Sequence, residues 1–202
     1  MQVTLQDVGK RFRQKWVLKD LNLILEPGKQ YVIAGNNGSG KSTLLKMISG
    51  YLTPTTGIIT WHKNGKTADP DHVFSSLSFT GPYLELPEEF SFLEMIRFHR
   101  QFKIFPGKLT NEDVVHIAGL HDAGEKSIRD FSSGMKQRVK LALAILPETS
   151  LLLLDEPCTN LDAKACHWYK ELVEQFGRGK TLVVASNHNP DEYRPGFSMI
   201  SL

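Results

Sequence analysis

Cysteine is scarce in this chain of 202 residues, which contains only Cys158 and Cys166. Two cysteines are too few for a disulfide framework, and neither stands in a metal-ligand spacing, so a reducing compartment is expected. Long apolar runs are also missing. No window approaches the ~20 apolar residues that a membrane-spanning helix needs, and the first ten residues lack the apolar centre of a signal peptide. We therefore expect a cytoplasmic protein, for which another chain would provide any membrane part.

Net charge is small as well. The chain has 24 Lys+Arg against 22 Asp+Glu, a formal net charge of +2, so the charge balance favours neither a nucleic-acid partner nor a general attraction to anionic lipid. No internal repeat, low-complexity tract or linker-like stretch is visible. With 41% hydrophobic residues, the chain suits one compact domain, or one domain with a subdomain, that buries a substantial core.

Strand and helix patterns alternate along the chain. Apolar runs predict strands at 3–8, 21–25, 30–34, 57–61, 151–154 and 181–185. Helices are predicted at 41–49, from Ser91 to about 102, from Thr110 to 119, from 133 to 147, and at 163–176 behind Asp162 as N-cap. This alternation favours an α/β layered domain with a largely parallel central sheet.

The most specific motif follows the strand at 30–34. Residues 35–42 read Gly-Asn-Asn-Gly-Ser-Gly-Lys-Ser and match the P-loop (Walker A) pattern G-x-x-x-x-G-K-[ST] in full. A triphosphate needs backbone N–H groups at close range, which a Cβ at Gly38 or Gly40 would obstruct, and the helix that follows points its positive end at the phosphates. The predicted nucleotide-binding residues are Gly35, Asn36, Asn37, Gly38, Ser39, Gly40, Lys41, Ser42 and Thr43.

Two residues of this loop have distinct chemical roles. Lys41 supplies a point charge for the β- and γ-phosphates, and the Ser42 hydroxyl can ligate Mg²⁺. The dinucleotide pattern G-x-G-x-x-G is not met, because Thr43 stands where its third glycine would be. The apolar strand before the loop and the helix after it favour an ATP site over an accidental glycine-rich turn.

An acidic pair, Asp155 and Glu156, directly follows the apolar run at 151–154. Ligands bind at the carboxyl ends of parallel strands in open α/β sheets. A carboxylate there can hold Mg²⁺, which we assign to Asp155. Glu156 is then free to polarise a water for in-line attack on the γ-phosphate, and is the predicted catalytic base.

Between these motifs, residues 131–138 read Phe-Ser-Ser-Gly-Met-Lys-Gln-Arg. This segment resembles the signature motif L-S-G-G-Q of the ABC ATPase family, with Ser132 and Gly134 matching. The form S-x-G-M-K-Q-R looks like that of several ABC exporter subfamilies. A serine and the free N–H groups of a helix N-terminus form an anion site. The resemblance implies that Ser132, Ser133, Gly134 and Met135 contact the γ-phosphate of ATP bound by the opposite subunit.

The resemblance covers essentially the whole chain. It implies a P-loop (RecA-like) core at about 1–82 and 146–202, with an N-terminal antiparallel β-subdomain and an inserted helical subdomain at about 83–145. It also implies a head-to-tail dimer, either a homodimer or a heterodimer with a second ABC subunit, that sandwiches ATP and Mg²⁺. An integral-membrane permease would be the partner, with this chain peripheral at the inner face of the cell membrane.

Further family positions can be carried over to this chain. Asn160, Leu161 and Asp162 are similar to the D-loop, which crosses the dimer interface. Phe12 sits where the family places an aromatic that stacks on adenine, and Trp16 is the competing candidate.

Two family residues have no clear counterpart. No glutamine occupies the Q-loop segment 77–85, where Tyr83 is nearest by register and Glu85 is a possible substitute. For the switch histidine, gapless register selects Asn187 and a one-residue shift selects His188. An asparagine can hydrogen-bond the γ-phosphate but cannot carry the charge of an imidazolium.

Two other classes of function were weighed against a transporter ATPase. A non-transport ABC ATPase acting on nucleic acid or ribosomes usually carries coiled coils or tandem cassettes, and no heptad run is present here. A P-loop kinase or GTPase would leave the signature and D-loop matches as coincidence. The favoured prediction is an ATP-hydrolysing subunit that drives transport through separate permease subunits.

Overall fold

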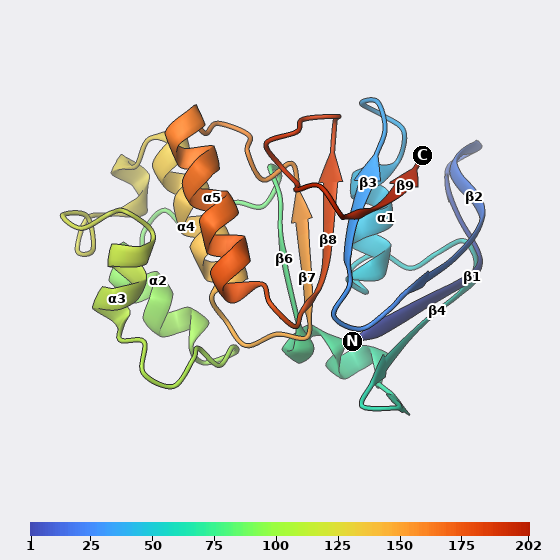
Figure 1. Cartoon of the computed structure of the whole chain (residues 1–202), viewed down its shortest axis with the longest axis horizontal. Helices are drawn as coiled ribbons and strands as arrows, with labels where there is room; N and C mark the ends of the chain where they lie inside the picture. The colour runs from blue at the N-terminus through green and yellow to red at the C-terminus, as the bar shows by residue number, and fades with distance from the viewer.

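The computed structural model describes residues 1–202 as two sheets with helices between and beside them (Figure 1). The larger sheet has five parallel strands in the order β6-β7-β8-β3-β9. These strands are β3 (Gln30–Ala34), β6 (Leu77–Thr80), β7 (Leu151–Asp155), β8 (Thr181–Ser186) and β9 (Ser198–Ser201). Their carboxyl ends meet at the upper edge of the sheet in Figure 1, above the labels of β7 and β8.

The N-terminal part forms a four-stranded antiparallel sheet in the order β2-β1-β4-β5. It consists of β1 (Gln2–Phe12), β2 (Lys15–Leu25), β4 (Thr56–Lys63) and β5 (Lys66–Thr67). Helix α1 (Lys41–Ile48) lies between this sheet and the parallel one and shares one apolar core with both. The indole N–H of Trp61 on β4 donates to the Ile48 carbonyl at 2.8 Å, which fastens the antiparallel sheet to the end of α1.

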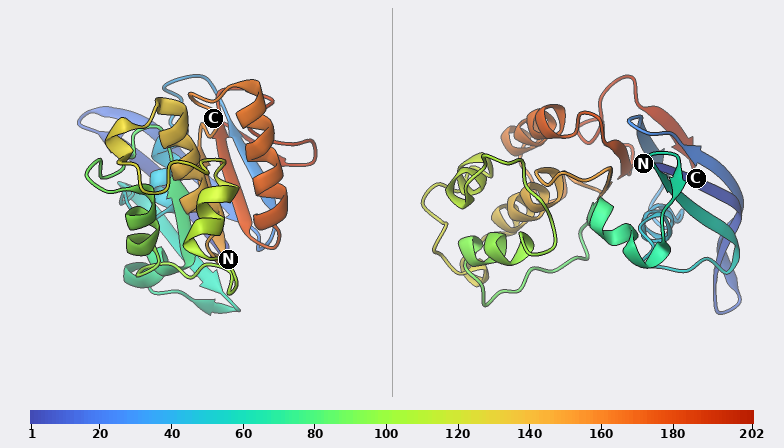
Figure 2. Two further views of the ribbon diagram at one scale, coloured as in Figure 1. Left: turned by 90° about the vertical axis from the view of Figure 1, so that its left-hand side faces the viewer. Right: turned by 90° about the horizontal axis from the view of Figure 1, so that it is seen from below.

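The other face of the parallel sheet is covered by helices (Figure 2). These are α2 (Phe92–His99), α3 (Asn111–Ile117), α4 (Ser133–Ile145) and α5 (Ala163–Phe176), with the 3₁₀ turn η2 (Ile128–Asp130). The other 3₁₀ turn, η1 (Pro70–Ser76), lies on the α1 side, where its Val73 joins the same apolar core as α1. Strand β7 explains the two cores, because its side chains alternate between the faces. Leu151 and Leu153 pack on the α1 side, whereas Leu152 and Leu154 pack on the α4 and α5 side.

The fold class expected from the sequence is confirmed, and most element boundaries agree. Capping boxes at Ser91 and Thr110 open α2 and α3 as predicted, and Asp162 caps α5. The predicted end of the helix that begins behind Ser91 is wrong, since α2 ends at His99 rather than at about residue 102. The strands differ in two ways: β1 continues to Phe12 and β2 begins at Lys15 rather than at 21, and β5, β6 and β9 were not predicted. Both cysteines are free, and no helix is long and apolar enough to cross a bilayer.

Candidate ATP site

The P-loop connects β3 to α1 at the carboxyl edge of the parallel sheet. Gly38 and Gly40 have φ values of 82° and 105°, a conformation that side chains with a Cβ rarely adopt. A Cβ on Gly40 would also lie 2.8 Å from Cδ2 of Leu18, whereas at Gly38 it would meet nothing within 4 Å. Backbone conformation thus requires glycine at both positions, which adds a reason to the close approach of phosphate argued from the sequence.

Lys41 folds back over this loop. Its side chain is buried, and Nζ donates to the carbonyls of Gly35 at 2.7 Å and Asn36 at 3.0 Å. No side chain caps the helix at Gly40, so the first N–H groups of α1 are left for another acceptor. A positive side chain and free amides at one helix end form an anion site of the kind that binds phosphate.

A cavity of about 480 Å³ opens in front of the loop. Its walls come from β2, the P-loop, α1, the segment after β6 and the end of β7. The lining residues are Val17, Asn37, Gly38, Gly40, Lys41, Ser42, Thr43, Pro82, Tyr83 and Glu156. Tyr83 therefore faces the phosphate loop, whereas Glu85 lines a different groove. Of the two Q-loop candidates, only Tyr83 lies at this cavity. Lys46, which lies outside the cavity lining, has its Nζ 5.7 Å from the Tyr83 ring centroid.

Asp155 ends β7 next to the P-loop and is almost fully buried. Burial raises the pKa of its carboxyl; the neighbouring Ser42 hydroxyl and the Lys41 charge oppose that rise, and Glu156 adds to it. Its Oδ1 has no hydrogen-bond partner. A buried carboxylate oxygen without a donor, beside a serine hydroxyl, is a suitable ligand pair for a hard cation.

Glu156 extends beyond the strand and is half-buried at the cavity wall. Its backbone has a positive φ of 44°, and its N–H donates to the Ala185 carbonyl of β8 at 2.9 Å. Thr159 Oγ1 lies 3.5 Å from Oε2 of Glu156. A non-glycine residue in this conformation needs support from its surroundings. That support comes from β8 and from the turn that follows.

The segment after Glu156 is held by two side chains that the sequence did not single out. Gln137 on α4 donates through Nε2 to the Pro157 carbonyl at 2.9 Å, and Glu192 accepts through Oε1 from the Cys158 N–H at 3.3 Å. Both side chains are buried. Gln137 lies within the segment that resembles the signature motif, but the motif match assigned it no contact, and Glu192 lies in a polar loop without a motif.

The signature and D-loop residues lie outside the cavity. Ser132 is the N-cap of α4 and its Oγ accepts from the Met135 N–H at 3.2 Å, while Ser132 and Ser133 are exposed. A Cβ on Gly134 would lie 3.2 Å from the carbonyl oxygen of Asn160, so the D-loop passes close to the start of α4. The helix end that would bind an anion is thus open to solvent and is not part of this chain's own phosphate cavity.

The predicted switch and adenine residues are not part of the cavity wall either. Asn187 and His188 follow β8 and are exposed, and His188 has a positive φ of 56°. Phe12 ends β1 with 48% of its surface exposed. Lys10 Nζ lies 5.4 Å from the Phe12 ring centroid, and the Trp16 ring has Arg11 and Lys19 at 5.4 and 5.5 Å.

A phosphate-binding loop joined to two carboxylates at the edge of a parallel sheet defines a P-loop nucleotide hydrolase. The family model for ABC transporters matches residues 18–159, and the chain belongs to that family. ABC transporter ATP-binding protein NatA of Bacillus subtilis is 29% identical over 201 residues, covering 94% of this chain and 80% of NatA. Spermidine/putrescine import ATP-binding protein PotA of Fusobacterium nucleatum is 32% identical over 165 residues, covering 80% of this chain and 44% of PotA.

Among solved structures, a dimeric post-hydrolysis state of the ATP-binding cassette MJ0796 bound to ADP and Pi superimposes with a TM-score of 0.84. It is 25% identical, and the match covers 99% of this chain and 94% of that one. The chain is accordingly an ATP-binding and ATP-hydrolysing subunit of the ABC transporter class that dimerises. These relatives support the transporter prediction over the nucleic-acid alternative.

Proposed function

We propose that this subunit binds Mg²⁺-ATP in the cavity before the P-loop and uses Glu156 to activate the attacking water. The observation that carries the proposal is the convergence of Lys41, Asp155 and Glu156 at one edge of the parallel sheet. Ser42 and Asp155 would hold Mg²⁺, whose chemistry is to neutralise charge on the β- and γ-phosphates. The unpaired Oδ1 of Asp155 and the adjoining hydroxyl supply the oxygen ligands that this ion prefers.

The remaining predicted site residues belong to the same proposal. Adenine would stack on Phe12, which is exposed and has one cation at its ring, rather than on the less exposed Trp16, which has two. The switch role falls to the segment Asn187–His188, because it follows β8 at the edge where the phosphates would lie. We retain the division into a core at about 1–82 and 146–202 and a helical subdomain at about 83–145.

The dimer is proposed to be head-to-tail, with the start of α4 from one subunit completing the site of the other. Exposure of Ser132 and Ser133, and their absence from this chain's own cavity, support a contact in trans. D-loop residues Asn160, Leu161 and Asp162 lie beside that helix end and would cross the same interface.

Mixing two inactive variants tests this arrangement. Lys41→Ala removes the phosphate lysine, and Ser132→Arg blocks the open end of α4. A head-to-tail mixed dimer contains one doubly damaged site and one intact site, so ATPase activity should return to a sizeable fraction of the wild-type value when the two are combined. Steady-state phosphate release is measured for each variant alone and for the mixture. A mixture no more active than its components would contradict the trans contact.

A second partner is proposed at an apolar groove of about 410 Å³ between β6 and the helices. Leu84, Leu86 and Met95 line it together with the half-exposed Phe74, and Lys103 and Lys140 border it. An amphipathic cytoplasmic helix of a polytopic permease suits such a groove, since its apolar face would cover these side chains. This contact would place the subunit at the inner face of the cell membrane.

Phe74→Asp tests the groove. Phe74 is 56% exposed, so the change should leave the fold and the ATPase of the isolated subunit intact while abolishing co-purification of a membrane protein from detergent extracts. Ile58→Asp is the matched control, because Ile58 is 62% exposed on β4, away from the groove. Equal loss of the membrane protein in both variants, or in neither, would refute the groove as its docking site.

A further inference from the structure

The peptide bond between Pro157 and Cys158 is held at both ends by buried side chains. Its carbonyl accepts from Gln137 Nε2 at 2.9 Å, and its N–H donates to Glu192 Oε1 at 3.3 Å. Gln137 is 2% exposed and Glu192 is 4% exposed. Gln137 and Glu192 thus form a clamp on this peptide. Gln137 comes from α4, which begins at the signature motif, and Glu192 comes from the loop that follows β8.

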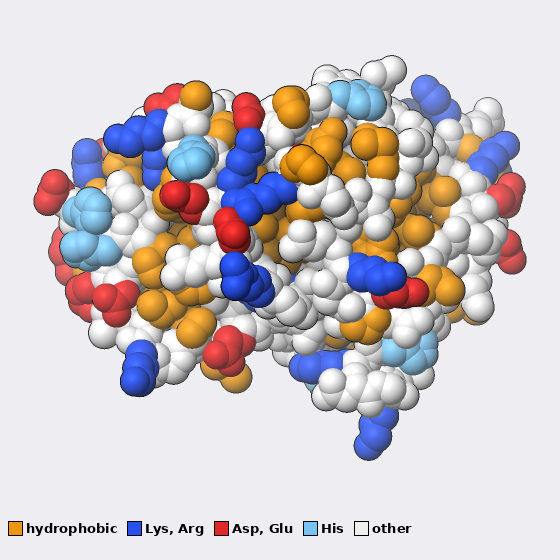
Figure 3. All heavy atoms as spheres, viewed as in Figure 1, with side chains coloured by type: hydrophobic (Ala, Val, Ile, Leu, Met, Phe, Trp, Pro, Cys, Tyr) orange, Lys and Arg blue, Asp and Glu red, His pale blue; other side chains and the backbone are white.

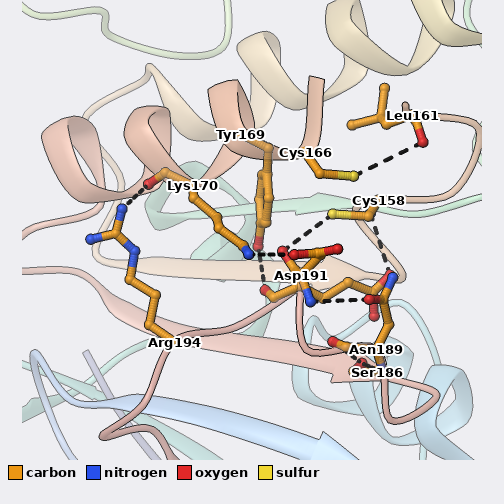
Figure 4. A network of polar contacts seen from close by, with 10 residues as sticks. Cys158, Leu161, Cys166, Tyr169, Lys170, Ser186, Asn189, Asp191 and Arg194 are labelled. Atoms are coloured by element: carbon orange, nitrogen blue, oxygen red, sulfur yellow. Dashed lines mark hydrogen bonds and ion pairs between the residues drawn. The ribbon is translucent and has the colours of Figure 1, made fainter. Parts of the chain in front are cut away.

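Glu192 is itself anchored to α5. Figure 4 labels the two α5 residues that hold this loop, Tyr169 and Lys170, together with Asp191, which precedes Glu192. The Tyr169 hydroxyl donates to the Glu192 carbonyl at 2.9 Å, and Lys170 pairs with the adjacent Asp191 at 2.6 Å. The Cys158 thiol donates to the Asp191 carbonyl at 3.4 Å, so Cys158, two residues before the D-loop, contacts this loop twice. Contacts from α5 therefore hold the backbone around Glu192, and its carboxyl reaches from there to the Cys158 N–H.

A carboxyl at this place is costly to bury. Burial raises the pKa of Glu192 to about 7; the Ser186 hydroxyl and the Cys158 N–H oppose the rise, and Glu156 and Asp155 add to it. Its Oε2 has no hydrogen-bond partner. An apolar side chain would avoid this desolvation cost, so stability alone does not explain an acid here.

We propose that Glu192 is a positioning residue for ATP hydrolysis, which together with Gln137 fixes the Pro157–Cys158 peptide and thereby the placement of Glu156 and of the D-loop. This inference rests on the proposed role of Glu156. The clamped peptide begins one residue after Glu156, whose backbone is in the left-handed region, and Thr159 closes the turn onto the Glu156 carbonyl at 3.1 Å. Displacing a catalytic group by about 1 Å can cost on the order of a hundredfold in rate.

The arrangement also connects the parts of the site. The same peptide joins α4, whose exposed N-terminus would meet ATP of the opposite subunit, to the loop that carries Asn187 and His188. A movement of either element would act on Glu156 through one peptide plane, which is a short physical route between the two halves of the dimer.

Substitutions that differ only in hydrogen bonding test the proposal. Glu192→Gln keeps an acceptor for the Cys158 N–H and should retain kcat within about threefold. Glu192→Met fills a similar volume without an acceptor and should lower kcat at least about tenfold with ATP affinity unchanged, because the P-loop is untouched. Gln137→Met removes the other half of the clamp. The fold loss of kcat in the double variant, Gln137→Met with Glu192→Met, should be smaller than the product of the two single fold losses, since both side chains act on one peptide.

One control and thermal melts separate positioning from folding. Glu174→Gln changes an exposed acid of α5 that pairs with Arg194 and makes no contact with the Pro157–Cys158 peptide. This variant should keep kcat near wild type, and thermal melts should show all variants folded. The proposal is overturned if Glu192→Met keeps wild-type kcat, or if Glu192→Gln is as impaired as Glu192→Met. It is also overturned if the loss of kcat in each variant is proportional to its fall in melting temperature. A wild-type protein without ATPase activity would instead reject the proposed function itself.

Discussion

Glu156→Gln should abolish ATP hydrolysis, leave ATP affinity unchanged and hold the protein as a dimer containing ATP. The glutamine keeps the size of the side chain and the contact to Thr159, but it cannot accept the proton of the attacking water. Loss of a general base costs at least about a hundredfold in turnover. Because hydrolysis is proposed to be the step that opens the dimer, a subunit that binds ATP without cleaving it should accumulate in the closed state.

Gel filtration with and without Mg²⁺-ATP, together with single-turnover hydrolysis, measures both consequences. Glu171→Gln serves as the control, because this exposed carboxylate of α5 lies away from the cavity and pairs only with His167. A Glu156→Gln protein that remains monomeric under saturating Mg²⁺-ATP would contradict the sandwich dimer. One that still hydrolyses ATP at the wild-type rate would remove Glu156 from the mechanism.

Lys41→Ala should lose nucleotide binding. In the structure the ammonium is buried and poised over the loop, bonded to the carbonyls of Gly35 and Asn36, so it can turn to the phosphates with little movement. A hydrogen bond to a charged group contributes about 1.5–3 kcal/mol. Losing two such bonds to phosphate should raise Kd at least a hundredfold, because a hundredfold change in Kd corresponds to about 2.7 kcal/mol of binding free energy.

Calorimetric titration with Mg²⁺-ATP checks this result, with a thermal melt to show that the variant is folded. Lys66→Ala is the matched control, because Lys66 is exposed on β5 and touches no part of the cavity. Lys41→Arg should bind poorly as well, since a planar guanidinium does not fit a site built around a compact ammonium. Unchanged affinity in Lys41→Ala would refute the P-loop assignment.

The distribution of charged side chains on the surface argues against a nucleic-acid partner. On the face drawn in Figure 3, basic and acidic side chains are intermixed over the helical side rather than gathered by sign. Lys170 with Asp191 and Arg194 with Glu174 are examples of such pairing. Nucleic-acid binding relies on an uncompensated positive surface, and neither the formal net charge of +2 nor this face provides one.

The sequence by itself determined the elements whose signals are local. The P-loop is eight consecutive residues between a strand and a helix, and the caps at Ser91, Thr110 and Asp162 act within three residues, so each could be predicted before any contact was known. The apolar run at 151–154 likewise predicted a buried central strand, because both of its faces are covered.

Tertiary structure decided what depends on contacts between distant segments. Strand β9 is largely exposed and carries no apolar alternation, so only its pairing with β3 identifies it. Tyr83 could be chosen over Glu85 only once the turn after β6 was seen to face the P-loop. Gln137 and Glu192 meet one peptide from positions 20 and 34 residues away. A sequence pattern records the period of a helix or strand, whereas the pairing of two buried polar groups is fixed only when the chain packs.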